Sequence, residues 1–82
     1  MTIRPELMRF VEKMEAKMQS HDEKRGDSWK KESLSYLIVR LQQEVVELHE
    51  AISNNKSNDE ISKEAVDIAN FSMMIFDMFN RE

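Results

Sequence analysis

Glycine and proline are almost absent from this sequence, and their scarcity constrains the fold more than any other feature. Among 82 residues there is one glycine, Gly26, and one proline, Pro5. Sheet-rich folds need many turns, and turns are where these two residue types are used most. Proline is well tolerated in a first helical turn, because its missing N–H would be unpaired there anyway. The sequence therefore predicts an all-α fold with long helices and few connections.

Apolar residues that recur at spacings of three and four mark three helices along the chain. These expected helices cover residues 5–19, 33–54 and 59–79. The polar segment between the first two, residues 20–28, contains the glycine and is expected to form a loop. The turn at residues 54–58 is short, so the two helices that it joins are expected to be antiparallel neighbours. The predicted fold is an antiparallel helical hairpin plus an N-terminal helix, within one domain of residues 1–82.

Ser57 indicates where the third helix begins. It stands three residues before Glu60, which is the spacing of a capping box. In that motif a serine side chain pairs with a free N–H of the first helical turn. We therefore expect Ser57 to be the N-cap of the third helix.

The chain is short for a domain that is stable by itself. A domain of this size buries only about 60% of the surface of its unfolded chain, and disulfides, a structural metal or oligomerisation usually add the missing stability. Cysteine is absent, which excludes disulfides. Residues 65–79 are apolar in nearly every helical direction, so protein should surround them. We expect an oligomeric helical bundle; the alternative is that this segment packs under the first helix of the same chain.

The charge distribution argues against several classes of partner. The formal net charge of −4 comes from interspersed acids and bases, which provide neither a basic footprint for nucleic acid nor a polybasic membrane patch. No run approaches the roughly 20 apolar residues of a membrane span. Residues 1–6 lack the apolar core of a signal peptide. We expect a cytoplasmic protein with no nucleic-acid or membrane partner.

Two pairs of acidic residues occupy matched positions on the second and third expected helices. Glu44 and Glu47 are three residues apart, as are Glu64 and Asp67. Residues three apart share a helical face, and both pairs lie about equally far from the intervening turn. Antiparallel helices would therefore direct four carboxylates into one small volume.

A divalent cation would make such a cluster stable. Like charges this close are destabilising, and Asp67 has apolar neighbours in the sequence, where an unpaired acid is costly. Oxygen ligands favour Mg²⁺, with Mn²⁺ as an alternative, and no histidine or cysteine has the spacing of a zinc ligand. The competing interpretation is two solvated helix faces, because glutamate is a strong helix former and often recurs at this spacing.

With these residues placed, the chain resembles the MazG-like superfamily of all-α nucleoside triphosphate pyrophosphohydrolases. That family carries a Glu-x-x-Glu pair followed by a Glu-x-x-Asp pair on the next helix, and here sixteen residues separate the two pairs. The segment Trp29-Lys30-Lys31 is similar to the family's approach to its second helix. The resemblance covers residues 26–77. The sequence departs from the family in two ways. Position 43 is Gln43, where many members have glutamate. The fourth helix of some members has no counterpart here, so a partner subunit is expected to complete the nucleotide pocket.

The resemblance implies a specific reaction and assembly. It implies Mg²⁺-dependent cleavage of a nucleoside triphosphate between its α and β phosphates, by a homodimer or homotetramer. The metal ligands that it implies are Glu44, Glu47, Glu64 and Asp67. Carboxylate-held Mg²⁺ neutralises phosphate charge and lowers the pKa of the attacking water, and one of the glutamates is a candidate to accept the proton of that water.

Three further residues are candidates for substrate binding. By the resemblance, Asn70 contacts the nucleotide; alternatively it is a buried amide that satisfies a neighbouring backbone group or orients Asp67. Trp29 is a candidate to stack on a base, and the alternative is that it anchors the core. Lys30 is a candidate to contact a phosphate, and the alternative is that it is solvated. The same two interpretations as for Lys30 apply to the basic residues Lys31, Lys56, Lys63 and Arg81.

Three other charged or titratable residues have simpler interpretations. Arg40 precedes Glu44 by one helical turn and is expected to pair with it. His21 lies in the expected loop and His49 lies beside the apolar stripe of the second helix. We expect both histidines to be bystanders.

Two alternative functions remain open. The first is phosphoribosyl-ATP pyrophosphohydrolase activity on the same fold, which only a substrate test separates from the first hypothesis. The second is a catalytically silent helical oligomerisation or interaction module. Such a module has no reason to hold facing acids, and Mg²⁺ should barely change its stability, whereas a ligand that binds only the folded enzyme stabilises it.

Overall fold

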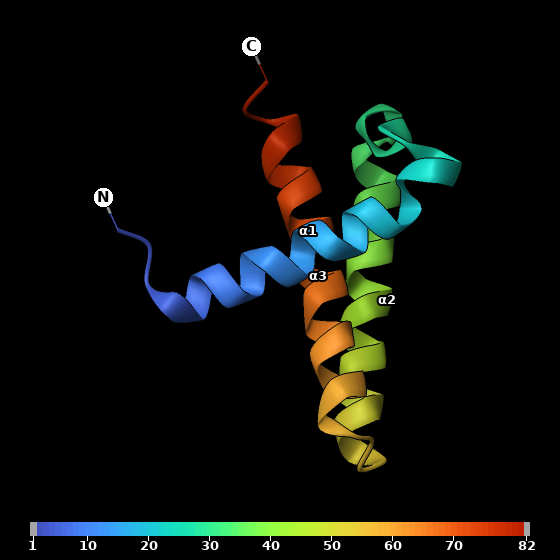
Figure 1. Cartoon of the computed structure of the whole chain (residues 1–82). Helices are drawn as coiled ribbons and strands as arrows, with labels where there is room; N and C mark the ends of the chain where they lie inside the picture. Colours follow the sequence, from blue (N-terminus) through green and yellow to red (C-terminus); the bar gives the residue numbers. More distant parts are fainter. Residues whose placement is uncertain (1, 82) are drawn as a thin grey trace.

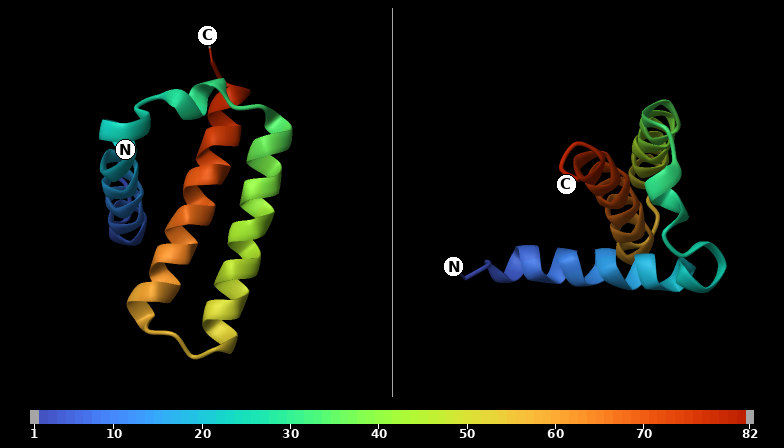
Figure 2. Two further views of the ribbon diagram at one scale, coloured as in Figure 1. Left: turned by 90° about the vertical axis from the view of Figure 1, so that its right-hand side faces the viewer. Right: turned by 90° about the horizontal axis from the view of Figure 1, so that it is seen from above.

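The computed structural model describes residues 2–81, and this part of the chain is all-α, as the sequence predicts. Its helices are α1 (Pro5–Arg25), the short 3-10 helix η1 (Ser28–Lys31), α2 (Leu34–Ser53) and α3 (Asn58–Met78). α2 and α3 lie side by side and run in opposite directions, and α1 crosses α3 at a steep angle (Figures 1 and 2). None of the helices within residues 2–81 combines the length and apolar character needed to cross a membrane.

The first helix is longer than the sequence predicts. α1 continues past residue 19 to Arg25, so the expected loop over residues 20–28 is wrong for its first six positions. Those positions are polar but contain no helix breaker, and polarity indicates exposure rather than a loop. The helix ends only at Gly26, whose φ of 50° suits glycine and whose N–H donates to the carbonyl of Asp22 at 3.0 Å.

Serine side chains cap the N-termini of α2 and α3. The Ser33 hydroxyl accepts a hydrogen bond from the N–H of Tyr36 at 3.1 Å. The Ser57 hydroxyl accepts one from the N–H of Glu60 at 3.1 Å, which confirms the predicted N-cap. Such caps satisfy N–H groups that have no partner within the helix.

A single chain buries few apolar side chains. Only Leu37, Ala51 and Val66 are buried among the apolar residues that the structure describes. Phe76 and Phe79, at the end of α3, are each 68% exposed. The N-terminal half of α1 projects away from the other helices (Figure 2), so α1 does not cover this end of α3. Residues 65–79 are therefore not packed under α1 along their whole length.

Candidate metal centre and adjoining cavity

Three of the four predicted carboxylates lie together between α2 and α3. Glu44 and Glu47 on α2 and Glu64 on α3 each offer one oxygen, and these oxygens lie within 4.8 Å of one another. Glu44 is only 4% exposed, Glu64 is half-buried and Glu47 is exposed. The spacing of three along α2 places its two glutamates on one face, and that face is turned toward α3. We refer to these three residues as the glutamate cluster.

The glutamate cluster is electrostatically unfavourable when all its members are charged. Burial, together with the neighbouring Glu47 and Asp67, raises the pKa of Glu44 to about 7 against the opposing effect of Arg40. Burial, followed by the charge of Glu47, also raises the pKa of Glu64. The Oε2 atoms of Glu44 and Glu64 are buried without a hydrogen-bond partner. A divalent cation would supply the partner that these oxygens lack.

Arg40 partly compensates the charge of the cluster. Its Nη2 lies 3.2 Å from Oε1 of Glu44, which confirms the predicted ion pair. Its Nη1 donates to Oε1 of Gln43 at 2.6 Å, and its guanidinium lies 5.2 Å from the centre of the Phe71 ring. Gln43 therefore contacts Arg40. The arginine engages only one oxygen of Glu44, so the other remains available to a metal ion.

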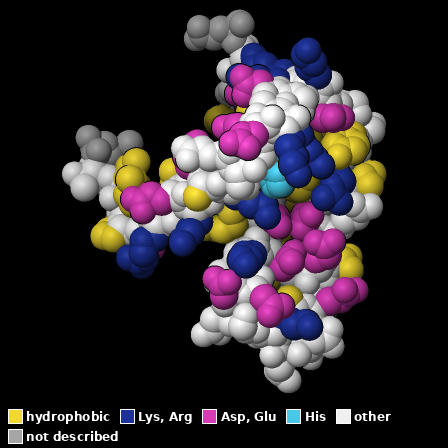
Figure 3. Space-filling view, turned by 45° about the vertical axis from the view of Figure 1, so that its right-hand side comes forward, with side chains coloured by type: hydrophobic (Ala, Val, Ile, Leu, Met, Phe, Trp, Pro, Cys, Tyr) yellow, Lys and Arg dark blue, Asp and Glu magenta, His cyan; other side chains and the backbone are white. Residues whose placement is uncertain are grey.

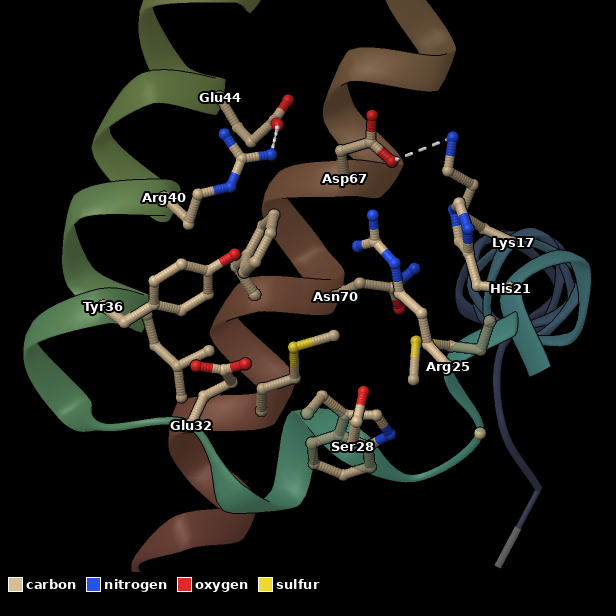
Figure 4. A pocket seen from close by; sticks show the side chains of 16 residues that line it. Lys17, His21, Arg25, Ser28, Glu32, Tyr36, Arg40, Glu44, Asp67 and Asn70 are labelled. Carbon is tan, nitrogen blue, oxygen red and sulfur yellow. Dashed lines mark hydrogen bonds and ion pairs between the residues drawn. The ribbon is translucent and has the colours of Figure 1, made fainter. Parts of the chain in front are cut away.

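Asp67 is not part of the glutamate cluster. The sequence predicts that four carboxylates lie together, and in the structure three of them do. Its Oδ1 forms an ion pair with Nζ of Lys17 on α1 at 3.6 Å (Figure 4). Its charge still contributes to the raised pKa of Glu44 and of Glu64, which places it close to both. The sequence pattern alone does not reveal Lys17, because that residue comes from a helix distant in the chain.

A cavity of about 630 Å³ adjoins the cluster and lies between α1, η1, α2 and α3. This volume is within the range of small-molecule sites, about 300–1,000 Å³. Glu44 and Asp67 form part of its wall, and its aromatic lining residues are Trp29, Tyr36 and Phe71. A smaller hollow of about 220 Å³ is lined by Glu47 and Glu64 among others. The glutamate cluster therefore borders both spaces.

Two of the three predicted substrate residues line the larger cavity. Asn70 is 4% exposed, and its Nδ2 donates to the carbonyl of Met14 at 3.3 Å, so this amide satisfies a backbone group of α1. Its Oδ1 is buried without a partner. Trp29 is half-buried in the cavity wall. Lys30 does not line the cavity; its ammonium lies 3.4 Å from Asp27 and 5.6 Å from the centre of the Trp29 ring.

The other basic candidates are not in the larger cavity either. Lys63 pairs with Asp59 at 3.3 Å and Arg81 pairs with Asp77 at 2.9 Å, in each case four residues apart in the sequence. Lys56 lines only the smaller hollow. These contacts agree with the interpretation of Lys63 and Arg81 as surface residues.

Three basic residues of α1 line the larger cavity, and none of them was predicted from the sequence to belong to a site. Lys17, His21 and Arg25 are spaced four apart, so they share one face of α1, and this face is turned to the cavity (Figure 4). Basic and acidic side chains also lie next to one another on the surface in Figure 3. The spacing was visible in the sequence, but the expected loop over residues 20–28 concealed it. His21, an expected bystander, lies in the cavity wall.

No family model, curated protein or solved structure matches the chain. Its function is therefore inferred from the glutamate cluster, the cavity and the sequence pattern.

Proposed function

We propose that this chain is a cytoplasmic, Mg²⁺-dependent nucleoside triphosphate pyrophosphohydrolase. One observation carries the proposal: three glutamate oxygens lie within 4.8 Å, and the almost fully buried Glu44 keeps one carboxylate oxygen without a partner. Acidic residues on a solvated helix face need no cation, whereas a buried carboxylate oxygen without a partner is costly. Oxygen ligands from carboxylates favour Mg²⁺, with Mn²⁺ as the alternative.

The residues of the cluster have distinct roles in this proposal. Glu44, Glu47 and Glu64 would hold the ion, and Asp67, whose charge acts on both Glu44 and Glu64, would join them once it is released from Lys17. Arg40 holds Oε1 of Glu44 and so orients the carboxylate that offers Oε2. When bound, Mg²⁺ neutralises phosphate charge and lowers the pKa of the attacking water.

The cavity and the sequence pattern support a nucleotide as the substrate. The cavity combines aromatic walls, which suit a base, with charged residues, which suit phosphates. The order and spacing of the two acidic pairs resemble those of MazG-like enzymes, which supports release of pyrophosphate over other Mg²⁺-assisted phosphate chemistry. Phosphoribosyl-ATP has the same chemical groups and belongs in the same test.

Pyrophosphate release tests the proposed reaction. The purified chain is incubated with each ribo- and deoxyribonucleoside triphosphate and with phosphoribosyl-ATP, with Mg²⁺, with Mn²⁺ or with a chelator. We expect at least one substrate to yield pyrophosphate and the matching monophosphate in equal amounts, only when a divalent cation is present. If the folded protein releases pyrophosphate from none of them, the silent module replaces the enzyme as the preferred hypothesis.

We also propose that the chain assembles into a homodimer or homotetramer. Phe76 and Phe79 are each 68% exposed, and Leu7 and Val11 on the projecting part of α1 are about half exposed. Apolar surface of this extent usually marks an interaction site, and a core of so few buried residues needs additional stabilisation. A second copy of the chain would cover this apolar surface and would add the missing stabilisation.

Substitution of Phe76 tests the assembly. We expect Phe76→Glu to lower the mass in solution toward that of the monomer, because a charge would enter an apolar interface. The measurement is sedimentation velocity or light scattering at several protein concentrations. Ser62→Glu adds the same charge at an exposed position of α3 and should leave the mass unchanged. A wild-type chain that is monomeric at every concentration would refute the proposed assembly.

A further inference from the structure

We propose that Lys17, His21 and Arg25 form a polyphosphate-binding face on α1, and that Lys17 exchanges Asp67 for a phosphate oxygen when a divalent cation binds the glutamate cluster. The class of ligand, a nucleoside triphosphate, rests on the proposed function. The binding face itself rests on the geometry of α1 and on the charges around the cavity.

The three residues form a continuous row along the cavity. Their spacing of four corresponds to about 6 Å along the helix axis per step, so the row is about 12 Å long. All three line the cavity, whose wall also contains Glu44 and Asp67 (Figure 4). A chain of phosphates placed between these walls would meet Lys17, His21 and Arg25 on the α1 side and the candidate metal site on the other side.

The row retains charge for a ligand. Within residues 2–81, His21 and Arg25 form no ion pair, and Lys17 pairs only with Asp67. A triphosphate carries more negative charge than one divalent cation neutralises, so further cations are needed around it. Arginine is well suited to this role, because its planar guanidinium donates two parallel hydrogen bonds to phosphate oxygens.

The ion pair between Lys17 and Asp67 is suited to exchange. Its N–O distance is 3.6 Å, and the Lys17 side chain is 42% exposed, so the pair contributes little stability. Asp67 is near enough to Glu44 and Glu64 to raise their pKa values. A divalent cation in the glutamate cluster would attract Asp67 and release the ammonium of Lys17 into the cavity. Metal and Lys17 therefore compete for one carboxylate.

Binding of inorganic tripolyphosphate tests the row without any need for catalysis. We expect Lys17→Met, His21→Gln and Arg25→Gln each to weaken its binding in the presence of Mg²⁺, by about tenfold for Arg25→Gln, as measured by titration calorimetry. Two control variants remove one charge from α1 outside the cavity. These variants are Lys13→Gln and Lys24→Gln. Lys13 lies on the same face of α1 one turn before Lys17, and Lys24 is the neighbour of Arg25 in the sequence. Neither residue lines the cavity. Both controls should bind tripolyphosphate within about twofold of wild type.

Titration with Mg²⁺ alone tests the exchange. Lys17→Met should bind Mg²⁺ more tightly than wild type, by a few-fold, because the competing ammonium is gone, while its affinity for tripolyphosphate falls. A merely structural lysine would change both affinities in the same direction or neither. Arg25→Lys, which keeps the charge, should recover most of the tripolyphosphate affinity that Arg25→Gln loses.

The outcomes separate this inference from the proposed function. If the row variants weaken tripolyphosphate binding but no nucleotide is hydrolysed, the binding face stands and the pyrophosphohydrolase proposal fails. If Mg²⁺-dependent hydrolysis occurs while the row variants leave tripolyphosphate affinity and KM unchanged, the binding face is refuted and the enzyme stands. Equal losses in Lys24→Gln and Arg25→Gln, or failure of tripolyphosphate to bind the wild type, would also overturn it.

Discussion

Glu44→Gln is expected to abolish Mg²⁺-dependent pyrophosphate release and, at the same time, to make the metal-free protein more stable at about pH 8. The loss of activity should exceed about a hundredfold, since replacing even an outer partner of a metal ligand costs about 10- to 100-fold. The stabilisation has a different cause. Glu44 is 4% exposed and its pKa is raised to about 7, so above that pH the folded metal-free chain carries an unfavourable buried charge.

Glutamine has nearly the same shape as glutamate and removes this charge. It can still accept the hydrogen bond that Arg40 now donates to Glu44. A gain of about 1 kcal/mol would raise the melting temperature by about 4–8 °C in a domain of this size. The measurements are pyrophosphate release and thermal unfolding in a chelator, at equal protein concentrations. A site that lowers stability for the sake of a ligand is a common feature of functional centres.

Glu12→Gln provides the matched control for this variant. Glu12 is an exposed residue of α1, so its replacement removes the same charge far from the cluster. It should change neither the activity nor the melting temperature appreciably. If Glu44→Gln keeps its Mg²⁺-dependent activity, Glu44 is not a metal ligand. If the metal-free variant is less stable than wild type, the carboxylate is compensated within the chain and needs no cation.

Mg²⁺ is expected to stabilise the protein much more at about pH 8 than at about pH 6. Protonated Glu44 cannot act as a ligand, and its pKa of about 7 lies between these two conditions. The ionised fraction of such a group rises about tenfold between them, so the apparent affinity for Mg²⁺ should rise about tenfold. Glu64, whose pKa is also raised, acts in the same direction.

The metal-free protein should show the opposite dependence on pH. The pKa of Glu44 is higher in the folded chain, about 7, than its ordinary value of 4.5. Between these values the folded state binds more protons than the unfolded state, so the free energy of unfolding falls as pH rises from about 4.5 to about 7 and then levels off. The melting curves with and without Mg²⁺ should therefore diverge as pH rises.

Thermal unfolding across this pH range, with Mg²⁺ or with a chelator, checks both dependences. In Glu44→Gln the effect of Mg²⁺ should be small and should depend less on pH through this range, because a ligand and the most strongly shifted titrating group are absent. An equal stabilisation by Mg²⁺ at both pH values in the wild type would mean that the ion binds elsewhere. No stabilisation at any pH would count against the metal centre itself.

Features that depend on local sequence were predicted well. The scarcity of glycine and proline predicted the all-α class, and the spacing of Ser57 and Glu60 predicted an N-cap that the structure contains. The spacing of three within each acidic pair is likewise a local property, because 3.6 residues per turn determine which side chains share a face. Arg40 was correctly paired with Glu44 for the same reason.

Features that depend on contacts between distant segments required the tertiary structure. Asp67 follows Glu64 at the same spacing of three at which Glu47 follows Glu44. In the structure, however, Asp67 pairs with Lys17 of α1 and is not a member of the glutamate cluster. The cavity exists only because α1, η1, α2 and α3 enclose a common space. Periodicity along one helix contains no information on the angle at which another helix crosses it.

The row formed by Lys17, His21 and Arg25 depends on both local sequence and tertiary contacts. The sequence by itself determined the spacing of Lys17, His21 and Arg25, which places them on one face wherever the backbone is helical. Only the structure decided that α1 continues through residues 20–25, where polar residues permit a helix as well as a loop. Only the packing of α1 across α3 decided that this face meets a cavity instead of solvent, because the direction of a helix face depends on what the helix packs against.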